Sequence, residues 1–160
     1  TGGENSVVAV SYSWSPPQEC PVEIWDVVGL KMVKRYDLSV ESACWLDITA
    51  DGNKLATLGK NELRIWSLDE RETVEFLSLS FPTPPETEML PYSRRLCFNQ
   101  SGDLLAACSE DGVQVINLKS KAVVFELKQP TQACALSPDG KTIAIAHASK
   151  KRVQLFPTGL

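Results

Sequence analysis

Histidine is the scarcest titratable residue of the sequence, and the only one is His147. No serine, cysteine or carboxylate stands at an informative spacing from it, and the sequence contains no phosphate-binding loop, dinucleotide fingerprint or metal-ligand cluster. Because His147 follows the apolar run Ile143–Ala146, we expect it to have a structural or surface role. The sequence therefore predicts no catalytic residues, no cofactor and no metal site, and the protein is not expected to be an enzyme.

Long apolar runs and an excess of one charge are also missing. No run approaches the roughly 20 residues of a membrane-spanning helix, and the first residues, TGGENSVV, do not resemble a secretory signal. The net charge of −4 at pH 7 provides no general attraction for a polyanion. We therefore expect neither nucleic acid nor a membrane as a partner. Because the sequence does not begin with methionine, we expect the N-terminus of the protein to lie elsewhere.

The cysteines are few and odd in number, and no two of them form a C-x-x-C pair. They are Cys20, Cys44, Cys97, Cys108 and Cys134. Four of the five fall in predicted strands, where a free thiol behaves as a small apolar side chain. We therefore expect reduced core cysteines in a cytosolic or nuclear protein. A disulfide is the second alternative, and a zinc site is the third.

What the sequence does contain is a repeat. The stretch Ser101–Leu118 combines a Gly-containing turn, an apolar run, an acidic turn and an alternating run, and this pattern predicts a β-hairpin. A two-stranded unit is marginal in water, so the approximate copies along the chain must stack on one another. With 160 residues, 43% of them hydrophobic, the chain is long enough for one domain with a core.

Two columns of residues align the copies. The first column is a large apolar residue followed by alanine: Val8-Ala9, Leu55-Ala56, Leu105-Ala106 and Ile143-Ala144. The second is an alternating run that ends in a bulky anchor, and the anchors are Trp25, Trp66, Ile116 and Phe156. The anchors are separated by 41, 50 and 40 residues, and the long interval contains the insertion Phe81–Ser93. Without that insertion the period is about 40 residues, which is typical of a repeat fold.

Each full period contains four strand-like segments. In the second copy they are Ala43–Thr49, Lys54–Leu58, Glu62–Ser67 and Thr73–Leu79, and in the third they are Arg94–Asn99, Asp103–Cys108, Val113–Leu118 and Ala122–Leu127. Val27–Leu38 and Glu70–Leu79 have the composition of helices, but each occupies the place of a fourth strand, so the period predicts strands there. The first copy lacks a first strand and the last copy stops after its third.

These features resemble the WD40 β-propeller family. The four-stranded period, the turns Thr49–Gly52, Asn99–Gly102 and Ser137–Gly140, and the intact dipeptide Trp25-Asp26 carry the resemblance. Trp66-Ser67, Ile116-Asn117 and Phe156-Pro157 are degenerate versions of that dipeptide. The resemblance implies an all-β fold: a β-propeller segment of about four consecutive blades, two complete and two partial, that does not close into a ring alone. The blades are expected at about 1–40, 41–81, 93–128 and 131–160, with an insertion at 82–92.

The copies also depart from the family pattern. None has the Gly-His that opens a regular unit, and only Asp111 stands where the family has its tight-turn aspartate. We therefore expect the Asp-His-Ser-Trp hydrogen-bond network of regular members to be absent. The Pro-containing loop Ser15–Pro21 is similar to loops of the echinoderm microtubule-associated-protein-like and ciliary WD40 proteins.

The insertions indicate a candidate binding face. In an up-and-down blade, the loops between the second and third strands lie on the same side as the loops between blades. Tyr12–Pro21, Phe81–Ser93 and Ala148–Lys151 should share that side, although they could also be tolerated surface loops. The candidate partner-binding residues are Tyr12, Trp14, Arg94, Arg95, Lys150, Lys151 and Arg152. Their positive charge favours acidic segments of a partner.

The resemblance implies a non-catalytic protein-protein interaction scaffold within a larger protein or assembly. A structural component of a microtubule-associated or ciliary complex is the alternative, and a propeller enzyme is a more remote one. We expect a cytoplasmic location, including the cytoskeleton or a cilium, with the nucleus left open. Further residues of the same protein or another chain should complete the ring, because the end blades are expected to expose Val8, Val10, Ile143 and Ile145.

Overall fold

The computed structural model of the chain describes residues 7–11, 20–38, 45–58, 63–68, 72–77, 95–109, 112–147 and 151–160. Every regular element in these ranges is a β-strand, so the described part holds no helix that could cross a membrane. The chain divides into two compact units, Thr1–Ser78 and Leu79–Leu160, which we call unit 1 and unit 2 and describe separately.

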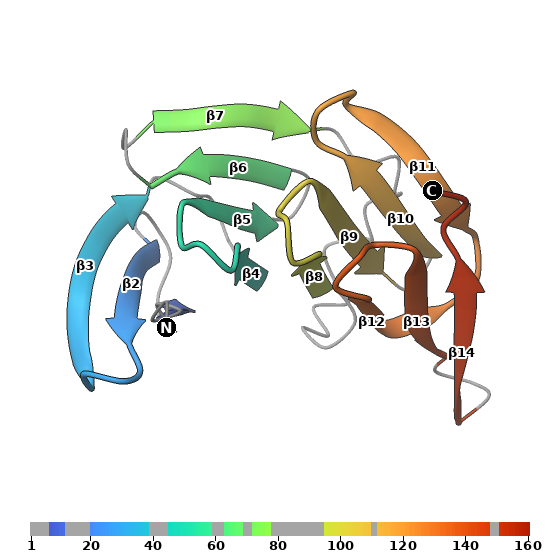
Figure 1. Cartoon of the computed structure of the whole chain (residues 1–160), viewed down its shortest axis with the longest axis horizontal. Helices are drawn as coiled ribbons and strands as arrows, with labels where there is room; N and C mark the ends of the chain where they lie inside the picture. The colour runs from blue at the N-terminus through green and yellow to red at the C-terminus, as the bar shows by residue number, and fades with distance from the viewer. Residues whose placement is uncertain are drawn as a thin grey trace, which may run out of the picture. The chain divides into compact units, whose positions relative to one another are not determined.

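Unit 1 contains two antiparallel sheets (Figure 1). Sheet I has the order β1-β2-β3, with β1 Val7–Ser11, β2 Cys20–Asp26 and β3 Lys31–Leu38. Sheet II has the order β4-β5-β6-β7, with β4 Trp45–Ile48, β5 Lys54–Leu58, β6 Leu63–Ser67 and β7 Glu72–Leu77. The two helix-like segments of the sequence thus form strands β3 and β7, as the period predicted.

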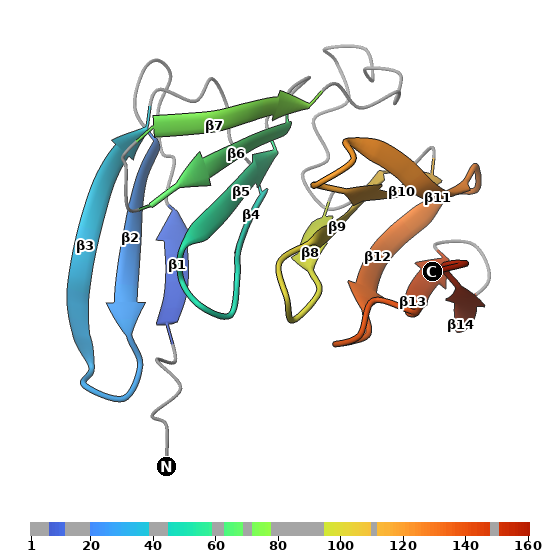
Figure 2. The same cartoon turned by 45° about the horizontal axis from the view of Figure 1, so that its top comes forward.

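Unit 2 has the same organisation (Figures 1 and 2). Sheet III has the order β11-β10-β9-β8, with β8 Arg95–Phe98, β9 Leu104–Ser109, β10 Gly112–Asn117 and β11 Ala122–Leu127. Sheet IV has the order β12-β13-β14, with β12 Thr131–Leu136, β13 Thr142–His147 and β14 Arg152–Pro157. Four antiparallel meanders of three, four, four and three strands make the chain an all-β propeller segment, as expected.

The two sequence columns are cross-strand neighbours in every sheet. The pairs are Val8 with Trp25, Leu55 with Trp66, Leu105 with Ile116, and Ile143 with Phe156. In sheets I, II and III the pairing with the fourth strand of the repeat shifts by one residue just before the anchor. The extra residue is a valine each time: Val33, Val74 and Val124. Such a bulge increases the local twist of the strand pair.

Each unit has its own core. In unit 1, Val22, Ile24 and Tyr36 of sheet I pack with Leu55 and Trp66 of sheet II. In unit 2 the core joins sheet III to sheet IV, and its fully buried members are Ala106, Cys108, Val113, Val115, Ile143 and Ile145. The rings of Phe125 and Phe156 lie against each other there, with centroids 6.1 Å apart.

The expected exposure of Ile143 and Ile145 is wrong, because neither side chain has any accessible surface. Both point towards sheet III and help to form the core of unit 2. The other face of sheet IV carries Ala144, which is only partly buried, whereas its counterparts Ala56 and Ala106 have no accessible surface. Neighbouring residues of a strand face opposite sides of the sheet, so Ile143 and Ile145 are buried on one face of β13 while Ala144 lies on the other.

Candidate protein-interaction edge

The strand register defines two edges in unit 2. At one edge, which we call the loop edge, β8, β10, β12 and β14 begin and β9, β11 and β13 end. Arg95 pairs there with Cys108, and Thr131 pairs with His147, which pairs in turn with Arg152. The opposite edge, which we call the turn edge, holds the turns Asn99–Leu104 and Ser137–Thr142.

The sequence-predicted partner-binding residues are only partly described. Lys151 and Arg152 are exposed at the loop edge, where β14 begins. Arg95 is the first residue of β8 at the same edge. Tyr12, Trp14, Arg94 and Lys150 lie outside the described residues, as does most of each insertion.

Lys128 is a loop-edge cation that sequence reasoning missed. Its side chain is 81% exposed, and its Nζ lies 3.6 Å from Oε2 of Glu126, at the end of β11. Because it stands alone in the sequence, it lacked the clustering that singled out the other basic residues. Its position two residues after Glu126, where the fourth strand of a repeat ends, was the available signal.

The sole histidine lies at the same edge but faces inward. His147 is 3% exposed, and its Nε2 has no hydrogen-bond partner in the part of the chain that the structure describes. Its strand neighbour Thr131 is also buried, and the Thr131 hydroxyl donates a hydrogen bond to the Gln129 carbonyl oxygen. Among the described residues, Nε2 of His147 therefore has no nucleophilic side chain within hydrogen-bond reach.

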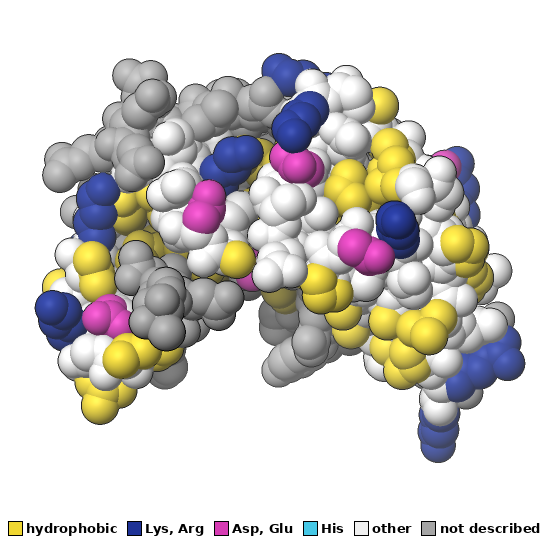
Figure 3. Space-filling view, in the orientation of Figure 1, with side chains coloured by type: hydrophobic (Ala, Val, Ile, Leu, Met, Phe, Trp, Pro, Cys, Tyr) yellow, Lys and Arg dark blue, Asp and Glu magenta, His cyan; other side chains and the backbone are white. Residues whose placement is uncertain are grey.

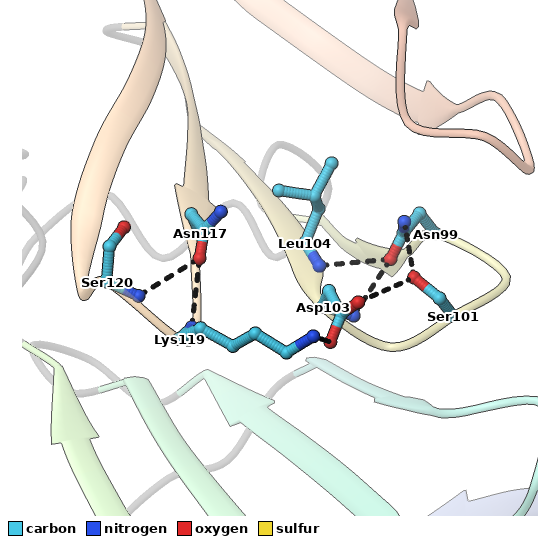
Figure 4. A network of polar contacts seen from close by, with 7 residues as sticks. All are labelled: Asn99, Ser101, Asp103, Leu104, Asn117, Lys119 and Ser120. Atoms are coloured by element: carbon cyan, nitrogen blue, oxygen red, sulfur yellow. Dashed lines mark hydrogen bonds and ion pairs between the residues drawn. The ribbon is translucent and has the colours of Figure 1, made fainter. Parts of the chain in front are cut away.

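The turn edge has a different character, because internal hydrogen bonds occupy its polar groups. In the Asn99–Leu104 turn, Oδ1 of Asn99 accepts hydrogen bonds from the backbone N–H groups of Asp103 and Leu104 (Figure 4). The Asn99 amide donates to Ser101, the Ser101 hydroxyl donates to Asp103, and Lys119 forms an ion pair of 3.1 Å with Asp103. The side chains of Asn99, Ser101 and Asp103 are therefore all engaged within the protein.

The other two described turns of this kind repeat this chemistry with different residues. In the Ser137–Thr142 turn, the Ser137 hydroxyl donates to Asp139, whose Oδ1 also accepts from the N–H of Lys141. In unit 1, the Thr49 hydroxyl donates to Asp51, whose Oδ1 also accepts from the N–H of Asn53. These hydrogen bonds lower the pKa of Asp139 and Asp51 below the ordinary value of 3.8, and the bond from the hydroxyl group has the largest effect in each case.

A backbone contact joins the two turns of unit 2. The N–H of Gln100 donates a hydrogen bond to the Pro138 carbonyl oxygen at 3.2 Å. Gly140, in the left-handed region at φ +72°, lies so close to Leu104 that a Cβ added there would clash with the leucine Cδ1. The turn edge is therefore a packed junction between sheets III and IV.

Asp26, the second residue of the intact dipeptide, stabilises the turn that follows it. It ends β2, and its Oδ1 accepts hydrogen bonds from the N–H groups of Gly29 and Val28, which lower the pKa of the carboxyl group. Asn117 ends β10 and accepts from the N–H groups of Lys119 and Ser120 in the same way. Asp111, the other expected turn residue, lies outside the described residues.

The anchor residues are packed to different degrees. Trp66 is 6% exposed, and its indole Nε1 donates a 2.9 Å hydrogen bond to the buried Thr57 hydroxyl. Ile116 is buried and Phe156 is partly buried. Trp25 is also only partly buried, and its indole donates to Glu23.

Three cysteines meet in the core of unit 2. Cys97, Cys108 and Cys134 are free thiols; Cys108 is buried, and the other two are partly buried. Hydrogen bonds with Cys108 and Cys97, followed by burial, raise the pKa of the Cys134 thiol well above its ordinary value. No group of potential ligands that could hold a metal ion occurs among the described residues.

Comparison with known proteins leaves the family open. No protein-family model matches the chain, and no curated protein matches it with significant similarity.

Proposed function

We propose that this chain is part of a divergent WD40-type propeller and acts as a non-catalytic scaffold that binds acidic segments of protein partners at its loop edges. The observation that carries the proposal is the group of exposed cations at the loop edge of unit 2. Lys128, Lys151 and Arg152 are exposed at the loop edge. At the turn edge, Asn99, Asp103 and Asp139 are already engaged within the protein.

Charge explains why the partner segment should be acidic. The chain as a whole is negative, so an acidic partner is attracted only where cations are concentrated. Exposed ammonium and guanidinium groups form charge-assisted hydrogen bonds with carboxylates, and these contacts weaken with salt. We place such a scaffold in the cytoplasm, including cytoskeletal or ciliary assemblies, or in the nucleus, where free thiols such as Cys108 remain reduced.

Cross-linking with a carbodiimide, which joins lysine amines directly to carboxylates, tests the proposal. The purified chain is incubated with cell extract, cross-linked and analysed by mass spectrometry. Partner carboxylates should be joined to Lys128 and Lys151, and the yield should fall between about 50 and 300 mM salt as screening increases. Lys119 and Lys141, exposed lysines of the turn edge, are the matched controls. Links made chiefly to these two lysines would overturn the choice of edge.

A further inference from the structure

Thiol groups from two neighbouring sheets meet in the core of unit 2. Cys97 lies on β8 and Cys108 on β9 of sheet III, whereas Cys134 lies on β12 of sheet IV. β12 packs against both β8 and β9, and all three cysteines belong to the same hydrophobic cluster. A covalent bond from Cys134 to either of the other two would therefore join the two sheets.

The strand register places the two thiols of sheet III on one face. Cys97 pairs with Ala106, and Cys108 follows two residues later on the same strand, so the two cysteines are diagonal neighbours on the face that packs against sheet IV. Diagonal Cα atoms are about 7–8 Å apart, which is more than the roughly 4.4–6.8 Å that a disulfide spans. Cys134, by contrast, forms hydrogen bonds with both Cys108 and Cys97 from the facing sheet. The geometry therefore favours disulfides that include Cys134.

The three thiols differ in their access to solvent and in their reactivity. Cys108 has no accessible surface, whereas Cys97 and Cys134 are only partly buried. Hydrogen bonds with Cys108 and Cys97, followed by burial, raise the pKa of the Cys134 thiol, and a protonated thiol is a poor nucleophile. An oxidant from solvent should therefore react first with Cys97. Figure 3 shows hydrophobic side chains over the sheet β12-β13-β14, a surface that suits a small uncharged oxidant.

From this arrangement we propose that the cluster is a peroxide-sensitive site, at which a disulfide between Cys97 and Cys134 cross-links sheet III to sheet IV. Hydrogen peroxide oxidises the Cys97 thiol to a sulfenic acid, and one water molecule is released. The Cys134 thiol then attacks the Cys97 sulfur, the S–S bond forms, and the sulfenic oxygen leaves as a second water molecule. The two thiols thus lose two electrons and two protons, and one peroxide molecule is reduced to two of water.

Cys108 allows the disulfide to rearrange within the cluster. Its thiolate attacks the sulfur of Cys134, a Cys108–Cys134 bond forms, and Cys97 leaves as a thiolate. Both disulfides join the same two sheets, so the cross-link survives the exchange. A small thiol reductant returns all three cysteines to the free state that the structure shows, and cytosolic disulfides are usually transient in this way. This inference goes beyond the proposed function and does not depend on it.

Peroxide treatment of the full chain tests the proposal. Cys20→Ser and Cys44→Ser together supply the background, so that every disulfide must come from the cluster, and the unsubstituted chain is measured alongside. The reduced protein is treated with hydrogen peroxide, and free thiols are alkylated at timed intervals before digestion without reductant and mass spectrometry. We expect Cys97–Cys134 to be the first disulfide, formed within one chain. The urea midpoint should rise after oxidation and return with dithiothreitol, because the bond closes a loop in the unfolded chain.

Single substitutions assign the role of each cysteine. Cys134→Ala should abolish every disulfide and the shift of the urea midpoint, and Cys97→Ala should abolish the early disulfide. Cys108→Ala removes the same sulfur atom from the same cluster and should retain both the Cys97–Cys134 bond and the shift, so it is the matched control.

Several results would overturn the proposal. They are a first disulfide between Cys97 and Cys108, disulfides formed only between chains, oxidation to sulfinic acid without any disulfide, and a urea midpoint that oxidation leaves unchanged. If an alanine variant does not fold, the order of disulfides in the background chain still decides between these outcomes and the proposed one.

Discussion

At the scale of single residues, the bond between Trp66 and Thr57 is the clearest stabilising polar contact of unit 1. Both side chains are buried, so an indole N–H without its acceptor would stay unsatisfied. Thr57→Val removes the hydroxyl while keeping the shape, and we expect it to lower the free energy of unfolding by about 1–3 kcal/mol. Urea denaturation measures this change.

A double-mutant cycle isolates the hydrogen bond from packing. In a Trp66→Phe background the indole N–H is already gone, so the added Thr57→Val should cost clearly less than it does in the wild type. Equal costs in the two backgrounds would mean that the hydroxyl and the indole do not interact.

At the scale of the elements, the turn between the first two strands of a repeat links stability to pH. Bonds from the Ser137 hydroxyl and the Lys141 N–H hold the pKa of Asp139 below 3.8, so the unfolded chain binds more protons than the folded chain in acid. The resulting stabilisation is present above about pH 4 and is lost as the pH falls through the folded pKa. We expect Ser137→Ala and Asp139→Ala both to flatten this dependence, measured by urea denaturation between about pH 2.5 and 6. Profiles parallel to that of the wild type would contradict this role of the turn.

The repeat period predicted the strands better than local composition did. Lys31–Leu38 and Glu72–Leu77 are rich in residues that also suit helices, yet both lie in sheets because the strand beside each fixes its pairing. The alignment of Leu55 with Trp66 also appears directly in the register. Such features follow from the sequence because each copy repeats them.

Exposure was harder to predict, since it depends on what covers a sheet. Ala144 and Ala106 occupy the same column, but the face of Ala106 is covered by sheet IV and the face of Ala144 is only partly covered. For the same reason, Trp25 and Trp66 differ in burial although both are anchors. The cation Lys128 was missed because one lysine carries no pattern until the strand order places it at the loop edge, after the end of β11.

At the scale of the whole molecule, each compact unit has a described hydrophobic core of its own, and each core stabilises its unit. Ile24 belongs to the core of unit 1, and Ile145, which has no accessible surface, belongs to the core of unit 2. Truncating a buried isoleucine to alanine costs about 2–5 kcal/mol. Because the lost contacts lie within one unit, we expect the loss to appear as faster opening of that unit.

Native-state hydrogen exchange measures the opening of each strand separately. Ile145→Ala should speed exchange in β9, β10 and β13 and leave β5 and β6 at the wild-type rate, while Ile24→Ala should do the reverse. The two variants serve as controls for each other, since the same side-chain atoms are removed. If either substitution accelerated exchange equally in both units, the chain would open as one cooperative body, and the two cores would have to be treated as one.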